Sequence, residues 1–202
     1  MTIPAGSDWD WPDSNWKRRK RTVSDRIFWS YAWLIATRIV QEKQLPPGAR
    51  KRNHIAVPDF YRLCRGEKTI RSLERDLFQS MLSGPCCLHC GSIERLTKDH
   101  LIPRSRGGDG DAENIITCCA KCNSSRGNTD LMHWYRKNQS FPCLVLMRQY
   151  LKICFKYATS MDLMDVEVDE AIRRGLPFDP VALPEKYPAL ENLIYDWRDC
   201  YN

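Results

Sequence analysis

The chain has 202 residues, enough for one compact domain or, as we favour, for a small catalytic module of roughly 50 residues with substantial flanking elements. Its net charge of +6 is unevenly spread: residues 159–202 hold ten acidic against four basic side chains, a net charge of −6, which leaves +12 on residues 1–158. This imbalance indicates that the first three quarters of the chain meet a polyanion, with a surface that is basic only for solubility as the alternative. The N-terminus lacks the apolar run of a signal peptide, and no segment approaches the ~20 apolar residues of a membrane span, so we do not expect a secreted or membrane-spanning protein. We expect a soluble, cytoplasmic protein without a membrane partner, and association with the nucleoid is left open.

The N-terminal region combines a basic arm with helices. Residues 1–22 hold three tryptophans and then five consecutive cations, which are Lys17, Arg18, Arg19, Lys20 and Arg21. These cations are candidate nucleic-acid contacts, because neutralisation of phosphates supplies much of nucleic-acid affinity; a solvated surface is the alternative. In the helical region 23–83, an apolar stripe predicts a helix from Ser24 to Gln44 and a second stripe predicts a helix over residues 69–82, with a basic cluster at residues 50–52 in the loop between them.

The C-terminal region, residues 139–202, is expected to be mainly helical and to end in an acidic tail. The apolar segment Cys143–Tyr157 predicts a helix that packs as core against the central part of the chain, the alternative being a protein-binding face. Prolines interrupt the tail, and a short helix is expected around Leu190–Trp197. The tail would shield a basic cleft or contact a partner.

Four of the ten cysteines form two C-x-x-C pairs, Cys87 with Cys90 and Cys119 with Cys122. Two such pairs complete a tetrahedral all-sulfur site with no open position, which is the arrangement of structural zinc. Two disulfides or a redox site are the alternatives. The 28 residues between the pairs are more than an ordinary zinc finger holds, so a further unit is inserted there. The other six cysteines are expected to be buried small side chains, namely Cys64, Cys86, Cys118, Cys143, Cys154 and Cys200.

The insert predicts a hairpin followed by a helix. A first strand over Leu96–Ile102 would end at Pro103, a glycine-rich loop would follow, and Glu113–Cys118 would return as the second strand. A helix is expected from Asn123, directly after the second cysteine pair. This module, residues 84–138, presents a carboxylate, an imidazole and two amides, which belong to Asp99, His100, Asn114 and Asn123. The remaining histidines are interpreted as ordinary, and His89 is left out of the metal ligands because Cys90 completes the spacing.

These positions, taken together, resemble a known family. C-x2-C, D-H-x2-P-x-S-x-G-G, an Asn six residues later and C-x2-C-N-x2-R-G are typical of the zinc-containing branch of the HNH endonucleases, also called ββα-metal or His-Me finger nucleases. The resemblance covers the 41 residues Cys87–Gly127. It implies that His100 is the general base, that Asp99 and Asn123 bind a catalytic divalent cation, and that Asn114 orients His100 or ties down the loop. The final H in the name HNH stands for a histidine at the position that Asn123 occupies here; asparagine is a common variant at this position and keeps an oxygen ligand.

The chemistry of these side chains agrees with that resemblance. Phosphodiester hydrolysis needs a water deprotonated near neutral pH, and a neutral His with a pKa of roughly 6.5 fits this role. Magnesium or manganese suits oxygen ligands, whereas zinc suits thiolates, so a structural Zn²⁺ and a catalytic Mg²⁺ or Mn²⁺ are expected. We therefore expect an α+β protein in which a small zinc-stabilised ββα-metal nuclease module is flanked by mainly α-helical segments. Three arginines that flank the site are expected to touch the cleaved backbone, namely Arg104, Arg106 and Arg126.

The expected activity is hydrolysis of DNA phosphodiester bonds, with 5′ phosphate and 3′ hydroxyl products as the resemblance implies. One site per chain cuts one strand, so a double-strand break would require a homodimer, a second binding event or a partner nuclease. Two other readings are left open: a zinc-stabilised nucleic-acid-binding protein without cleavage activity, and an assembly subunit whose flanks dock onto a targeting or defence complex. Restriction, phage defence, mobility of a genetic element, packaging and repair are the biological roles that stay open, and the sequence does not decide between DNA and RNA as the substrate.

Overall fold

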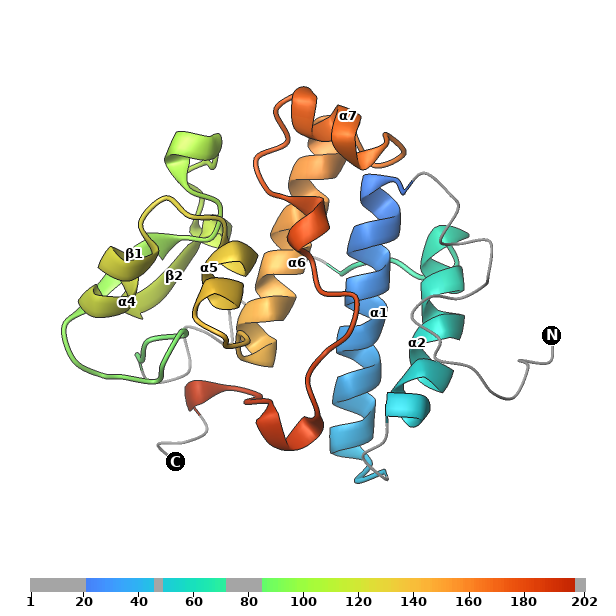
Figure 1. Cartoon of the computed structure of the whole chain (residues 1–202), viewed down its shortest axis with the longest axis horizontal. Coiled ribbons are helices and arrows are strands. Elements are labelled where there is room, and N and C mark those ends of the chain that lie inside the picture. Colours follow the sequence, from blue (N-terminus) through green and yellow to red (C-terminus); the bar gives the residue numbers. More distant parts are fainter. Residues whose placement is uncertain (1–20, 46–48, 72–84, 199–202) are drawn as a thin grey trace.

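The computed structural model describes residues 21–45, 49–71 and 85–198 and combines helices with one small sheet (Figure 1). The helices of the flanks are α1 (Val23–Glu42), α2 (Ala49–Cys64), α6 (Leu144–Ser160) and α7 (Val168–Arg173). The central part contains β1 (Leu96–His100), β2 (Ile115–Cys119), α4 (Ala120–Arg126) and α5 (Leu131–Lys137). Short 3-10 turns complete the chain, at Arg104–Arg106 (η2), Ala112–Asn114 (η3), Pro180–Ala182 (η4) and Leu190–Asn192 (η5). The predicted mixture of helices with a small sheet is confirmed. Most of the basic arm and most of the predicted helix 69–82 lie outside the described residues.

Helix α1 is the centre of the helical part and lies between α2 and α6 in Figure 1. It begins one residue earlier than predicted, because Thr22 caps it and forms a reciprocal capping box with Asp25. Its largest buried side chains are Trp29 and Trp33, whose rings meet edge to face with centroids 6.3 Å apart. Burial of such large rings stabilises the packing of α1 against its neighbours.

Helix α2 corrects the prediction of a basic loop at residues 50–52. The chain is helical from Ala49, and Arg52 is buried, with its guanidinium carbon 5.2 Å from the Trp33 ring centroid. Arg52 also donates a 2.7 Å hydrogen bond to the Pro188 carbonyl. This arginine therefore joins α2, α1 and the C-terminal segment, and it is not available on the surface as a nucleic-acid contact.

The central hairpin pairs β1 with β2 in antiparallel register, from Leu96 opposite Cys119 to His100 opposite Ile115. Strand β1 begins at Leu96 as predicted but ends two residues earlier, at His100, whereas β2 begins two residues and ends one residue later than predicted. Helix α4 begins at Ala120 instead of Asn123. The cause is a cap that the sequence pattern did not suggest, since the Cys119 thiol accepts a hydrogen bond from the Cys122 amide at 3.4 Å. The second cysteine pair thus starts α4 and places Asn123 inside its first turns.

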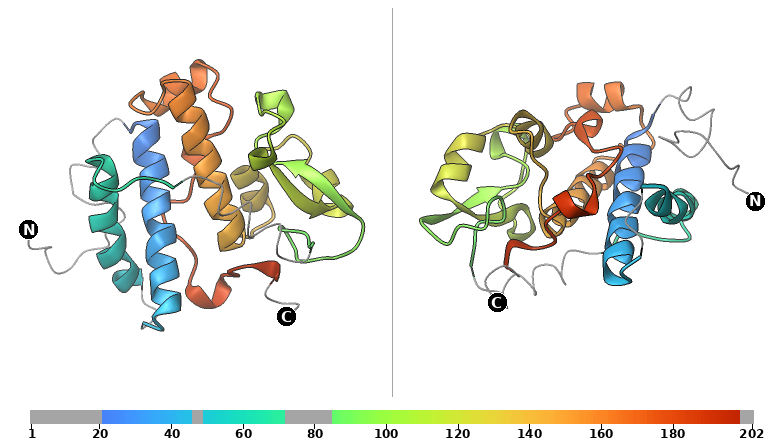
Figure 2. Two further views of the ribbon diagram at one scale, coloured as in Figure 1. Left: turned by 180° about the vertical axis from the view of Figure 1, so that it is seen from behind. Right: turned by 60° about the horizontal axis from the view of Figure 1, so that its bottom comes forward.

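The C-terminal segment after α7 runs back across α1 and α6 towards the hairpin module, as Figures 1 and 2 show from several sides. Arg26 of α1 holds it through hydrogen bonds to the carbonyls of Pro180, Val181 and Leu183. The predicted helix at residues 190–197 is instead the short turn η5, after which two carbonyls accept hydrogen bonds from the first amides of α6. Within the described residues no helix is long and apolar enough to cross a membrane.

Candidate functional site

Four cysteine sulfurs form a cluster at one end of the hairpin. The sulfurs of Cys87, Cys90, Cys119 and Cys122 all lie within 4.8 Å of one another, which is a group that can hold a metal ion. Cys87 is fully buried and Cys90 is exposed, so the cluster lies at the edge of the module rather than in its centre. The first pair is shaped by a tight turn in which the Gly91 amide donates to the Cys87 carbonyl at 2.7 Å. The spacing-based prediction that these four thiols converge is thus met by the geometry.

The thiols of this cluster interact strongly. Burial raises the pKa of Cys87 to about 11, and burial together with neighbouring thiols raises the pKa of Cys122 far above its ordinary range. Burial acts in the same direction on Cys119, but hydrogen bonds from the Cys122 amide and the neighbouring thiols outweigh it and lower its pKa to about 7. Four thiolates at this spacing repel one another unless a cation lies between them. The donor set therefore fits a sulfur-preferring cation.

The remaining cysteines follow the prediction in part. Cys86, Cys118, Cys143 and Cys154 are buried, as expected for small apolar side chains. Cys64, at the end of α2, is exposed and so contradicts it. Cys200 lies outside the described residues.

Arg126 of α4 lies in the interior and binds the end of β1 that is farther from the cysteine cluster. It is 1% exposed, and its guanidinium donates to Asp99 Oδ2 at 2.6 Å and to the carbonyls of His100 and Leu101 at 2.7 Å each. Burial would raise the pKa of Asp99, but the nearby His89 and the charge of Arg126 outweigh it and lower this pKa below its ordinary value. Asp99 is therefore held as a carboxylate. The expectation that Arg126 touches nucleic acid is wrong, because its side chain lies in the interior.

His89 lies on the other side of the same carboxylate. Its Nε2 is 3.6 Å from Asp99 Oδ2, and its Nδ1 is 2.9 Å from the Tyr135 hydroxyl. The imidazole also packs edge to face on Trp134, with ring centroids 5.0 Å apart. The turn between the first two cysteines therefore reaches the carboxylate at the end of β1.

Asn114 fastens the loop that follows β1. It is fully buried, and its Oδ1 accepts a 2.8 Å hydrogen bond from the Ile102 amide. Its Nδ2 donates to the carbonyls of Ile102 and Asp109 at 3.0 and 2.8 Å. A Cβ on Gly108 would lie 1.9 Å from the Ile102 carbonyl oxygen, which explains why a glycine is required beside Asn114. Of the two roles expected for Asn114, these contacts support the one that ties down the loop.

His100 is the last residue of β1, and Asn123 of α4 contacts the same strand. The Asn123 side-chain amide donates to Thr97 Oγ1 at 3.1 Å and to the Lys98 carbonyl at 3.2 Å, which places it beside the residue that precedes Asp99. Within the described part of the chain, no hydrogen bond reaches Asn123 Oδ1, Asp99 Oδ1 or either ring nitrogen of His100. Two side-chain oxygens, on Asp99 and Asn123, and the imidazole of His100 are thus available to a ligand, whereas the side chains of Asn114 and Thr97 beside them are hydrogen-bonded.

The other predicted nucleic-acid contacts differ in their placement. Arg104 and Arg106 are exposed on η2, four and six residues after His100, and Arg106 also donates to the Pro177 carbonyl at 3.2 Å. Arg21 forms an ion pair with Glu185 of the C-terminal segment. Lys17, Arg18, Arg19 and Lys20 lie outside the described residues.

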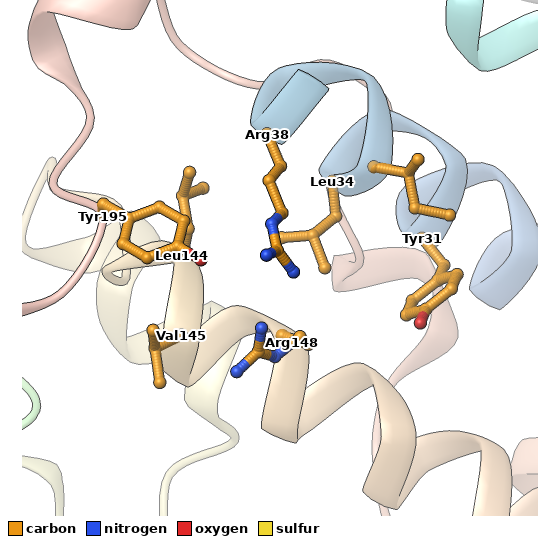
Figure 3. A pocket seen from close by; sticks show the side chains of 8 residues that line it. Tyr31, Leu34, Arg38, Leu144, Val145, Arg148 and Tyr195 are labelled. Atoms are coloured by element: carbon orange, nitrogen blue, oxygen red, sulfur yellow. The ribbon is translucent and has the colours of Figure 1, made fainter. Parts of the chain in front are cut away.

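A separate pocket of about 70 Å³ lies between α1 and α6 (Figure 3). Arg38 and Arg148 approach each other in it, and Tyr195 closes one side. None of the residues that line it belongs to the hairpin, to α4 or to the cysteine cluster. It is therefore distinct from the candidate site.

A two-stranded hairpin and a helix, with four cysteines that could hold a metal ion, form a ββα module that matches a known family. Residues 87–132 match the family described as HNH endonuclease, and so this part of the chain is an HNH nuclease domain. It is similar to the CRISPR-associated endonuclease Cas9 of Corynebacterium diphtheriae, with 37% identity over 68 residues, which are 31% of this chain and 6% of that protein. It is also similar to Cas9 of Actinomyces naeslundii, with 32% identity over 60 residues, which are 28% of this chain and 5% of that protein. The chain thus spans about one twentieth of these relatives. No solved structure matches.

Three contributors to the site were not identified from the sequence. His89 and Tyr135 reach Asp99 and its surroundings, and Tyr157 accepts a 2.6 Å hydrogen bond from the Asp109 amide in the loop. The position of His89 between Cys87 and Cys90 could have indicated its role, because the residues inside a buried turn must pack against neighbouring side chains. Nothing in the pattern around Tyr135 or Tyr157 distinguishes them from ordinary core residues.

Proposed function

We propose that this chain is a metal-dependent endonuclease that hydrolyses DNA phosphodiester bonds at the end of strand β1. The observation that carries the proposal is a set of side-chain atoms on His100, Asp99 and Asn123 that have no hydrogen-bond partner in the described part of the chain, beside Thr97 and Asn114, whose side chains are hydrogen-bonded. Buried and half-buried polar groups ordinarily find partners, so acceptors left available together favour a ligand. The HNH match over residues 87–132 includes all three residues.

Asp99 and Asn123 are the residues that would hold a catalytic divalent cation. Their donors are oxygens, which suit Mg²⁺ or Mn²⁺, whereas the four-cysteine cluster suits a structural Zn²⁺. When bound, the catalytic cation would supply counter-charge for the transition state and for the departing 3′ oxygen. An intracellular, reducing location belongs to this proposal, because it keeps the four thiols available to zinc.

His100 would act as the general base. It follows Asp99 at the end of β1, is partly exposed, and has both ring nitrogens available within the described residues. A neutral imidazole there would accept the proton of the attacking water. Because Arg126 binds the carbonyls of His100 and Leu101 and Asn114 binds the Ile102 backbone, the imidazole is presented from a fixed strand end.

Arg104 and Arg106 would contact the DNA backbone next to the scissile phosphate. Both are exposed on η2, in the loop that Asn114 fastens to β1. Cations at such positions orient the duplex without reading its sequence. One site of this kind cuts one strand, so we expect nicking with 5′ phosphate and 3′ hydroxyl products.

The test is cleavage of supercoiled plasmid, linear duplex, single-stranded DNA and RNA by the purified chain, with Mg²⁺, Mn²⁺ or chelator. We expect metal-dependent nicking of DNA that His100→Ala abolishes while zinc content and DNA binding are retained. His54→Ala is the matched control, because His54 is an exposed histidine on α2, outside the module. Cleavage that persists in rigorously pure His100→Ala protein would remove the proposed role of His100. DNA binding without cleavage by the wild-type chain would favour the reading as a binding module.

A further inference from the structure

We propose that Arg126 is a positioning residue that holds one carboxylate oxygen of Asp99 in a hydrogen bond and leaves the other oxygen to bind the catalytic cation. The inference rests on the function proposed above and concerns how the site is held. Arg126 itself does not touch substrate or cation, because its side chain is 1% exposed. Its effect would pass through Asp99 and through the backbone at the end of β1.

The contacts of Arg126 span three consecutive residues. One nitrogen, Nη1, donates to Asp99 Oδ2 at 2.6 Å and to the His100 carbonyl at 2.7 Å, and Nη2 donates to the Leu101 carbonyl at 2.7 Å. A planar guanidinium can make these bonds at once from a single fixed orientation, whereas a lysine ammonium is a point charge on a flexible stem. Arg126 therefore sets both the carboxylate and the strand end that carries His100.

Oδ2 is enclosed from a second direction as well. His89 Nε2 lies 3.6 Å from it, and His89 is itself held by the Tyr135 hydroxyl at 2.9 Å. Rotation of the carboxylate out of its present plane would break the 2.6 Å bond to Arg126 in a buried position, where an unpaired charge is costly, and a half-turn would only exchange two equivalent oxygens. Oδ1, which accepts no hydrogen bond in the described part of the chain, stays directed away from these partners. Asp99 would thus serve as a one-oxygen ligand of fixed orientation.

The charge of Arg126 has a second consequence. The ion pair with Asp99 is neutral overall, so a divalent cation meets less negative charge here than at an unpaired carboxylate. Loss of the guanidinium should raise the affinity for the cation and at the same time loosen the geometry. A merely structural arginine would do neither, since its loss would only lower the fraction of folded protein.

The experiment compares wild type, Arg126→Met and Arg126→Lys in plasmid nicking over a range of Mn²⁺ concentrations, with zinc content and thermal unfolding recorded for each. Direct Mn²⁺ binding is followed through the electron paramagnetic resonance signal of the free ion. For Arg126→Met we expect a kcat about 100-fold lower, the usual cost of misplaced catalytic groups, with a lower half-saturating Mn²⁺ concentration and tighter direct binding. For Arg126→Lys, which keeps the charge, we expect a kcat about tenfold lower with Mn²⁺ affinity near wild type.

The matched control is Arg26→Lys. Arg26 is also a buried arginine that donates to three carbonyls and a carboxylate, but it lies in α1. We expect Arg26→Lys to lower the melting temperature without changing kcat or the Mn²⁺ dependence of the folded protein. A kcat in either Arg126 variant that falls only in proportion to its folded fraction, at unchanged Mn²⁺ affinity, overturns the proposal. If Arg126→Met does not fold, Arg126→Lys decides. Absence of Mn²⁺-dependent nicking by wild type would instead refute the proposed function.

Discussion

Asn114 offers a quantitative test of how the loop after β1 is held. Asn114→Ala removes three hydrogen bonds from a fully buried side chain and leaves the Ile102 amide without its acceptor. At about 1 kcal/mol for each bond, and about 1–2 kcal/mol more for the stranded amide, the free energy of unfolding should fall by about 4 kcal/mol. For a chain of this size that corresponds to a melting temperature lower by about 8–16 °C. Nicking should also fall, because the loop begins two residues after His100.

The assay is urea and thermal unfolding followed by circular dichroism, at a fixed zinc concentration because a bound metal shifts the apparent stability. The matched control is Asn138→Ala. Asn138 donates one hydrogen bond, to the Trp134 carbonyl at 2.9 Å, from an exposed position at the end of α5, so its loss should cost under about 1 kcal/mol. A loss below about 1 kcal/mol for Asn114→Ala as well would refute the reasoning that this amide fastens the loop.

Three further changes test other parts of the structure. Cys119→Ser should lower the zinc content and the melting temperature together, because structural zinc contributes to the folding free energy. Glu185→Gln should lower the free energy of unfolding near neutral pH by about 1 kcal/mol. Burial raises the pKa of Glu185, but its arginine partners outweigh this and hold the pKa below 4.5, so its contribution is present above that pH and is lost as the pH falls through the lower folded-state value. Arg104→Ala combined with Arg106→Ala should weaken DNA binding and reduce the slope of log affinity against log salt by about 2.

Each of these changes has a matched control elsewhere in the chain. For the zinc test it is Cys64→Ser, an exposed thiol outside the cluster, and equal zinc loss in both variants would contradict the assignment. For the pH test it is Glu67→Gln, an exposed glutamate paired with an arginine on the surface, which should leave stability almost unchanged at every pH. For the salt test it is Arg173→Ala with Arg174→Ala, two exposed arginines at the end of α7. An equal change of salt slope in this pair would show only a general effect of net charge.

The elements that the sequence predicted well are those with local signals. The spacing of four cysteines predicted the cluster, and Pro103 with the following glycines predicted the hairpin turn closely. The apolar run after Cys143 predicted helix α6, which extends three residues beyond the predicted end to Ser160. In each case the residues that determine the structure are close together in the chain.

The errors arose where distant contacts decide. The basic cluster at residues 50–52 is predicted to lie in the loop after the first helix, yet Arg52 lies over Trp33 and donates to the Pro188 carbonyl, partners that local patterns cannot reveal. Arg126 is predicted to touch the cleaved backbone because it flanks the site in the sequence, whereas its three acceptors lie 25 to 27 residues earlier in the chain and hold it in the interior. Burial of Arg126 cannot be predicted from the sequence, yet it is this burial that keeps the guanidinium in a fixed position against Asp99.

The candidate site depends on the helical flank as well as on the cysteine cluster. A two-stranded sheet with one short helix buries little apolar surface and is marginal alone. Helix α6 supplies further support at the loop between the strands: Tyr157 accepts from the Asp109 amide at 2.6 Å, Lys156 pairs with Glu113 at 2.7 Å, and Gln149 donates to the Glu113 carbonyl at 3.1 Å. The cysteine cluster therefore fixes one end of the hairpin and α6 fixes the other. Since His100 lies between these two supports, loosening either one should displace it, even though neither touches the imidazole.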